Sequence, residues 1–169
     1  MPHVYTTKLG ATAAAALADG SDNPTVARVE ADNALFNETT WDRQRGNVEI
    51  TLLASAARTA TANTADQTNY NHRGAVFTLD VTVVSGTTPT LDVKIQALDT
   101  LSGKYADIPG AAFAQKTAAN TSQLVVYPGV AETANVSVSD VLPRKFRAVC
   151  TIAGSTPSFT FSLGAALVL

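Results

Sequence analysis

The stretch 75–98, AVFTLDVTVVSGTTPTLDVKIQAL, decides the fold class. Apolar residues alternate with polar ones on both sides of a central Ser-Gly-Thr-Thr-Pro. The apolar positions are Phe77, Leu79, Val81 and Val83 before it, and Leu91, Val93, Ile95 and Ala97 after it. A period of two places the apolar side chains on one face of a β-strand and the polar ones on the other. We therefore expect two strands joined by a turn into a hairpin, with its apolar face at the centre of the core.

The same alternation recurs between turn residues along the rest of 47–169. Further strands are expected at 48–53, 58–62, 104–108, 112–116, 123–127, 145–152 and 159–165. Short strands separated at fairly regular intervals by Gly, Pro and Asn are typical of a sandwich of two sheets. The sequence therefore predicts an all-β protein in which 47–169 is an antiparallel, jelly-roll-like β-sandwich of about eight strands.

Two shorter regions precede this domain. The first, 1–33, is expected to be a partly extended arm. Its segment ATAAAALA (11–18) favours a helix by propensity, but a helix of eight residues is marginal in water, so an arm that orders only against a partner is an equal alternative. The cluster at 19–24 resembles a calcium loop, yet it lacks the spacing and the closing Glu of an EF-hand, so we expect no metal site. The second region, 34–46, is predicted to be a small β-hairpin.

Composition and charge narrow the possible partners. Charged residues make up 15% of the chain, against about 25% in an average domain. The net charge is −2 and no basic block is present, so neither nucleic acid nor an anionic membrane is an expected partner. The sequence shows no apolar signal-peptide core and no run of 18 apolar residues, so we expect a protein that stays soluble where it is made. The single cysteine, Cys150, lies in an alternating run and is expected to be a buried small apolar residue.

The loop 63–74, NTADQTNYNHRG, ends with three residues that could carry chemistry, Tyr70, His72 and Arg73. A catalytic histidine needs a nucleophile or a carboxylate partner, and neither occurs at a recognisable spacing. A role in loop hydrogen bonding or in a subunit contact is the better interpretation. Paired carboxylates for glycosidase chemistry, hydrolase triads and nucleotide-binding glycine loops are also not recognisable. We therefore predict no catalytic residues, no cofactor and no enzymatic activity.

The predicted hairpin at 34–46 carries a second candidate contact surface. It contains Leu35, Phe36, Trp41, Arg43 and Arg45. Trp and Arg are enriched in the residues that dominate binding energy at interfaces. The alternative is that Trp41 packs the arm onto the main domain and that the charged residues are merely solvated. Both interpretations remain open at this point.

Two parts of the sequence resemble structural proteins of tailed bacteriophages. The run TTWDRQRGN (39–47) resembles a Trp-Asp-Arg-x-Arg-Gly segment of such proteins, which is often preceded by a stretch like the Leu-Ala-Asp-Gly and Asn-Pro-Thr within 17–25. The run TLLASAARTATANTADQTNYNHRGAVFTLDVT (51–82) resembles a second phage virion module. Further pieces of that module are LDVKIQALDTLSGKYADIPG (91–110), LVVYPG (124–129), VLPRKFRAVCTIAG (141–154) and FSLGAALVL (161–169). The resemblance covers about 17–169.

The resemblance implies a structural protein of the virion, made in the bacterial cytoplasm. We expect a decoration (cement) protein on the outer surface of the head, which binds the major capsid protein and itself, as a homotrimer. Alternatives are a component of the tail, neck or baseplate, and a host-glycan-binding module that would use exposed aromatics among Tyr5, Trp41, Tyr70, Tyr105 and Tyr127. The residues predicted to contact the capsid or a neighbouring protomer are Tyr5, Leu35, Phe36, Trp41, Arg43, Arg45, Tyr70, His72 and Arg73.

Overall fold

The computed structural model describes residues 34–36, 41–43 and 46–169. Tyr5, Arg45 and the predicted arm 1–33 lie outside the described residues. The chain divides into two units, 1–44 and 45–169. In the first unit, β1 (Ala34–Phe36) pairs antiparallel with β2 (Trp41–Arg43), and Phe36 lies opposite Trp41 in the register. This pairing is the hairpin expected within 34–46.

In the second unit, every described residue lies in a strand, turn or loop, and the strands form one sheet. Its main order is β3-β10-β6-β8-β9, while β4 and β5 pair with β10 and β7 pairs with β6. The bounds are β3 Val48–Arg58, β4 Ala62–Asn63, β5 Gln67–Thr68, β6 Gly74–Asp99, β7 Lys104–Ala112, β8 Asn120–Val126, β9 Ser137–Val138 and β10 Lys145–Val168. The protein is therefore all-β in its described part.

Two very long strands, β6 and β10, organise this sheet. They pair antiparallel along almost their whole length, from Phe146 opposite Ala97 to Val168 opposite Gly74. The prediction that 75–98 forms a hairpin is wrong, because its two halves bond to β10 and not to each other. The stretches 145–152 and 159–165, predicted as separate strands, are likewise the two halves of β10.

The predicted turns are bends inside these strands. Gly86 has φ +114° and Thr88 φ +48° in β6, and Gly154 and Thr156 have φ +122° and +48° in β10. A Cβ at Gly86 would meet the carbonyl oxygen of Thr156 at 2.6 Å, and a Cβ at Gly154 would meet that of Thr88 at 2.7 Å. Each bend therefore packs closely on the other, and only glycine permits both the contact and the backbone angle.

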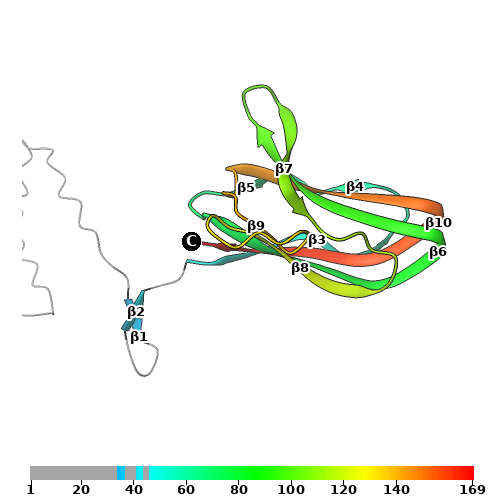
Figure 1. The fold of residues 1–169 in the computed structure, drawn as a ribbon, viewed down its shortest axis with the longest axis horizontal. Helices are drawn as coiled ribbons and strands as arrows, with labels where there is room; N and C mark the ends of the chain where they lie inside the picture. Colours follow the sequence, from blue (N-terminus) through cyan, green and yellow to red (C-terminus); the bar gives the residue numbers. More distant parts are fainter. Residues whose placement is uncertain (1–33, 37–40, 44–45) are drawn as a thin grey trace, which may run out of the picture. The chain divides into compact units, whose positions relative to one another are not determined.

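The bends double the strand pair over, so that its two halves face each other across the core (Figure 1). Phe77, in the first half of β6, and Phe146, in the first half of β10, meet edge to face with ring centroids 6.0 Å apart. The residues that alternate inward are fully or almost fully buried: Phe77, Leu79, Val81, Leu91, Val93, Ile95, Phe146, Ala148, Cys150, Phe159, Phe161 and Leu163. Val83 was expected among them but is 56% exposed, because it lies beside the bend and a register shift at Thr160.

The outer strands differ from the prediction in several places. β3 continues to Arg58, so only the two ends of the expected strand at 58–62 are extended, Arg58 as the last residue of β3 and Ala62 as the first of β4. Little of the expected strand at 112–116 forms, since β7 ends at Ala112 and Lys116 makes one isolated bridge to Leu91. The sheet is also mixed, because β8 and β9 pair in parallel through Val125 and Val126. The observed architecture is thus an open mixed sheet that is folded over on itself.

Candidate functional site

The polar loop before β6 folds around a buried amide, the side chain of Asn69. Its Nδ2 donates to the carbonyl oxygens of His72 (2.8 Å) and Leu142 (3.0 Å), and its Oδ1 accepts from the His72 backbone N–H (2.9 Å). A buried amide that satisfies three backbone groups fixes the loop, because each lost bond would leave a polar group without a partner. The residues that follow, Tyr70 to Arg73, are thereby held against the segment around Leu142.

His72 uses its imidazole to hold the start of this unit. Its Nε2 lies 2.7 Å from the carbonyl oxygen of Gly46. Since a carbonyl only accepts, Nε2 is the donor in this hydrogen bond. Nδ1 is buried and has no hydrogen-bond partner within the described residues. The geometry is that of a structural hydrogen bond, since no carboxylate of the described part orients the ring.

Two arginines lie over two tyrosines at this end of the sheet. The Arg73 guanidinium carbon is 5.8 Å from the centroid of the Tyr127 ring, and that of Arg144 is 5.7 Å from the Tyr70 ring. Tyr127 is held in turn, since its hydroxyl donates to the carbonyl oxygen of Leu169 at 2.8 Å. Tyr70 is 71% exposed and both arginines are exposed. We call these four residues, Tyr70, Arg73, Tyr127 and Arg144, the Arg–Tyr end.

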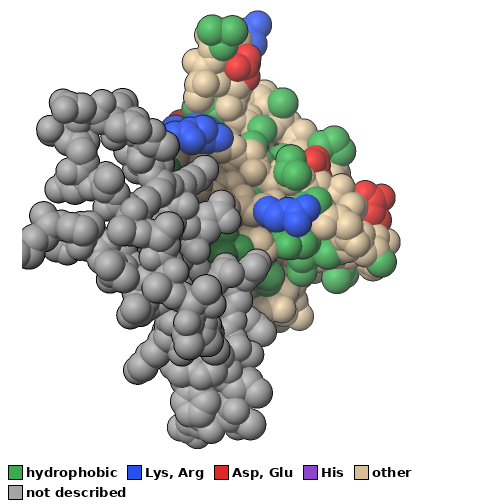
Figure 2. All heavy atoms as spheres, turned by 90° about the vertical axis from the view of Figure 1, so that its left-hand side faces the viewer, with side chains coloured by type: hydrophobic (Ala, Val, Ile, Leu, Met, Phe, Trp, Pro, Cys, Tyr) green, Lys and Arg blue, Asp and Glu red, His purple; other side chains and the backbone are tan. Residues whose placement is uncertain are grey.

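The backbone beneath the Arg–Tyr end belongs to the sheet. The Arg73 N–H donates to the Val168 carbonyl at 2.9 Å, and the Arg73 carbonyl accepts from Leu142 at 2.9 Å. These bonds lie where β6 begins and β10 ends, close to the C-terminus marked in Figure 1. Figure 2 views the molecule from that side, and basic side chains lie among hydrophobic ones on the part of the surface that is not covered in grey. The surface therefore joins positive charge with exposed aromatic and apolar area.

The structure thus brings Tyr70, His72 and Arg73 together, and it adds Tyr127 and Arg144. For one of the two added residues, Tyr127, the position in the strand pattern could have been a signal. Tyr127 follows β8 directly, and β8 runs antiparallel to β6 with Val126 opposite Ala75. The end of one such strand and the start of the other share an edge of the sheet. For Leu35, Phe36, Trp41 and Arg43 the structure describes the backbone of β1 and β2, and Tyr5 and Arg45 lie outside the described residues.

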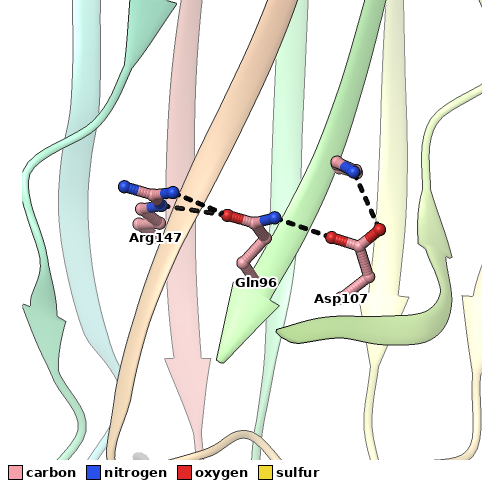
Figure 3. Close-up of polar contacts among 4 residues, drawn as sticks. Gln96, Asp107 and Arg147 are labelled. Carbon is pink, nitrogen blue, oxygen red and sulfur yellow. Dashed lines mark hydrogen bonds and ion pairs between the residues drawn. The ribbon is translucent and has the colours of Figure 1, made fainter. Parts of the chain in front are cut away.

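A second polar cluster lies on the half of the folded sheet in which the end of β6 pairs with the start of β10 (Figure 3). Arg147 donates from Nε (3.0 Å) and Nη2 (2.9 Å) to Gln96 Oε1, and Gln96 Nε2 donates to Asp107 Oδ1 at 2.7 Å. Lys94 Nζ lies 2.7 Å from the other oxygen of Asp107. The hydrogen bond from Lys94, and then that from Gln96, lowers the pKa of Asp107. The Asp107 carboxylate is therefore stabilised in its ionised form by Lys94 and Gln96 and is a poor general acid.

Tyr105 lies beside this cluster and is covered on one face. The guanidinium carbon of Arg147 is 3.3 Å from its ring centroid, and its hydroxyl donates to both carboxylate oxygens of Asp66, at 2.9 and 3.0 Å. The hydrogen bond to Asp66 raises the pKa of Tyr105. A sugar-binding site uses a free face of an aromatic ring. In each of the three described tyrosines an arginine lies over one face of the ring. Tyr70, the most exposed of the three, offers the largest open aromatic surface.

In the part of the chain that the structure describes, the one cysteine is buried and the other potential metal ligands are dispersed. Burial raises the pKa of the Cys150 thiol to about 12, so the thiol stays protonated at neutral pH. Among the described residues, no three His, Cys, Asp or Glu side chains are grouped so as to hold a metal ion. No helix of the described part is long and apolar enough to cross a membrane.

A shallow hollow of about 610 Å³ lies on the outer face of β3, β10, β6 and β8. It is lined mainly by small or uncharged residues.

No family model matches the sequence, and neither a curated protein nor a solved structure matches it.

Proposed function

We propose that this protein is a non-enzymatic structural protein of a tailed-phage virion. More specifically, we propose a decoration protein that binds the outer surface of the head as a homo-oligomer, with the trimer expected from the resemblance. The Arg–Tyr end carries the proposal, because it is an exposed surface of the residue types that dominate interface energetics. The sequence resemblance at 39–47 and 51–82 supplies the phage context.

The Arg–Tyr end is suited to binding because its side chains are already positioned. An arginine over an aromatic ring loses less side-chain freedom on binding than a solvated one, so more of the contact energy remains as affinity. The two exposed guanidinium groups, of Arg73 and Arg144, suit a partner that presents carboxylates. We propose that this partner is the major capsid protein on the outer face of the shell.

An oligomer adds to such an interaction through multivalency. When one oligomer touches several capsid subunits, contacts that are weak individually sum to stable attachment. The folded-over sheet, with one core between its two halves, is compatible with a β-sandwich of jelly-roll type, and we propose that class as the finer description of the fold. We expect the protein to be made in the bacterial cytoplasm and to need no cofactor.

Binding to particles tests this proposal. Purified full-length protein is mixed with heads lacking it, with tails lacking it, and with a glycan array, and bound protein is measured after sedimentation or washing. Saturable binding to heads at a fixed ratio supports decoration. Binding to tails alone, or to a glycan alone, contradicts it and favours the corresponding alternative.

A matched pair of variants assigns the contact. Arg144→Gln and Lys94→Gln each remove one positive charge, the first at the Arg–Tyr end and the second in an exposed ion pair between β6 and β7. We expect Arg144→Gln to weaken head binding about tenfold or more, as for an interface hot spot, and Lys94→Gln to leave it unchanged. Equal effects would show that the Arg–Tyr end is not the contact surface.

A further inference from the structure

The hairpin that joins β6 to β7 has an exposed leucine at its tip. The turn from Asp99 to Lys104 joins the two strands, and its apex residue, Leu101, is 96% exposed. Figure 1 shows this hairpin projecting from the sheet, and in Figure 2 the same projection, at the top, carries hydrophobic, acidic and basic side chains. We call residues 99–104 the finger.

The finger is hydrogen-bonded within itself although it is exposed. Asp99 Oδ1 accepts from the Leu101 N–H at 3.0 Å, and Oδ2 accepts from the N–H (3.3 Å) and the hydroxyl (2.6 Å) of Ser102. Gly103, at φ +69°, closes the turn with a 2.8 Å bond from its N–H to the Asp99 carbonyl. An apolar side chain on a fixed turn loses little conformational entropy when it is buried by a partner.

A hollow that fits such a side chain lies where β7 approaches the loop before β9. It has a volume of about 310 Å³. We call it the socket; its lining residues are Pro109, Gly110, Glu132, Thr133, Ala134, Ser137 and Val138. Its wall is also hydrogen-bonded. Thr133 and Ser137 exchange two backbone hydrogen bonds, of 3.0 and 2.9 Å, and the Ser137 hydroxyl donates to the Ala131 carbonyl oxygen at 2.7 Å.

The socket cannot receive the finger of its own chain. Lys104 and Pro109 belong to the same strand, β7, and five residues of strand span about 17 Å. The extended strand therefore holds the finger away from the socket beneath it. An occupant with the shape and chemistry of the finger has to come from another molecule.

The finger and the socket carry opposite charges at Lys104 and Glu132, while the Asp99 carboxylate of the finger is hydrogen-bonded within its own turn. Lys104 is exposed at the base of the finger, and Glu132 is exposed at the socket. We propose that the finger of one copy of this chain enters the socket of a second copy, with Leu101 in the hollow and Lys104 facing Glu132. Because the finger and the socket are different surfaces, the contact is head to tail and generates a closed ring or an open chain. This inference concerns self-association only and holds whether or not the partner is a phage head.

Sedimentation equilibrium of the full-length protein over a range of concentrations tests the leucine. Leu101→Thr removes the apolar apex, and Val83→Thr makes the same kind of change at another exposed apolar position. Burial of one leucine changes an association constant about tenfold to a hundredfold, so we expect that loss for Leu101→Thr and less than a twofold change for Val83→Thr. A monomeric wild-type protein, or equal effects of the two changes, would overturn the proposal.

A charge swap tests the register of the contact. Lys104→Glu and Glu132→Lys each place like charges opposite one another, and we expect each to weaken self-association at low salt. The double variant restores the pair and should recover association to within about threefold of the wild type. A double variant as weak as the sum of the two single changes would exclude the proposed pairing. Head binding is measured separately, so a protein that associates but ignores heads refutes the proposed function and leaves this inference intact.

Discussion

Substitution of Gly154 by alanine should strongly destabilise the fold, because the bend in β10 has no room for a methyl group. A Cβ at this position would lie 2.7 Å from the Thr88 carbonyl oxygen and 2.9 Å from the Pro89 Cα. Both atoms belong to backbone, so they cannot move aside as a flexible side chain would. The φ of +122° also lies outside the region that residues with a Cβ adopt readily.

The size of the effect follows from these two costs. Backbone strain in such a region contributes about 1–3 kcal/mol, and overpacking against fixed atoms contributes about 1–3 kcal/mol more. We therefore expect the free energy of unfolding to fall by about 4 kcal/mol. For a unit of this size, 1 kcal/mol corresponds to roughly 3–5 °C in Tm, so Tm should fall by about 12–20 °C.

Urea and thermal unfolding, followed by far-ultraviolet circular dichroism, measure this loss. Two glycines serve as controls. Gly103→Ala meets no atom within 4 Å but retains φ +69°, so it should lose about 1–2 kcal/mol from the backbone alone. Gly164→Ala lies in an extended strand, where the nearest atom would be the Ile50 carbonyl oxygen at 3.6 Å, so it should be neutral or stabilise by about 0.5–1 kcal/mol.

The three variants, ranked by their loss in free energy of unfolding, test whether the two bends pack against each other. If Gly154→Ala costs less than about 1 kcal/mol, or no more than Gly103→Ala, the two bends do not pack against each other as described. The reasoning about how β6 and β10 double over would then be refuted.

Three further predictions concern the core, the thiol and the finger. Phe77→Ala removes a fully buried ring from the contact between the two halves and should lower the free energy of unfolding by about 3–5 kcal/mol in urea titrations. Cys150 is buried and should react with a thiol reagent only when the protein unfolds, so rapid labelling of the folded protein would contradict its burial. Because burial raises its pKa to about 12, the free energy of unfolding should be undiminished below about pH 9 and fall as the pH rises above it. The hydrogen bond from the Ser102 hydroxyl lowers the pKa of Asp99 below the ordinary range of an aspartate. The finger should therefore be ordered at neutral pH and loosen as the pH falls through this lowered pKa, which amide exchange at Leu101 and Ser102 would detect.

The sequence predicted the β class and the inward residues because both depend on a local period of two. Phe77 and Leu79 are buried as the alternation required, and so are Phe146 and Cys150. The pairing of the strands could not be predicted in the same way, because it depends on contacts between segments that are distant in the sequence. Ser-Gly-Thr-Thr-Pro has the composition of a hairpin turn, yet here it bends one strand, because a second strand carries a matching bend beside it.

That second bend gives the sequence signal that local analysis lacks. Gly154-Ser155-Thr156-Pro157 repeats the Gly-x-Thr-Pro pattern of Gly86-Thr87-Thr88-Pro89, and both copies show the same order of positive φ values. Thr87 lies opposite Ser155 in the register between the strands. Two copies of a bend motif, each flanked by alternating residues, are therefore a better indication of paired bent strands than of two independent hairpins.

The candidate site was predicted only where it is contiguous in sequence. Tyr70, His72 and Arg73 lie within four residues, so their neighbourhood was visible. Their partners Tyr127 and Arg144 come from segments more than 50 residues away, and only the strand pairing brings them near. The 96% exposure of Leu101 in the finger depends on the pairing of β6 with β7 up to Asp99 opposite Lys104, which a single stretch of sequence does not indicate.

Cryo-electron microscopy of heads saturated with the purified protein tests the central claim most directly. The account predicts ordered density on the outer surface, with Tyr70 and Arg144 of the Arg–Tyr end against the shell and the bends at Gly86 and Gly154 away from it. Density in which the bends face the shell, or heads that stay bare at saturating protein, would contradict the account.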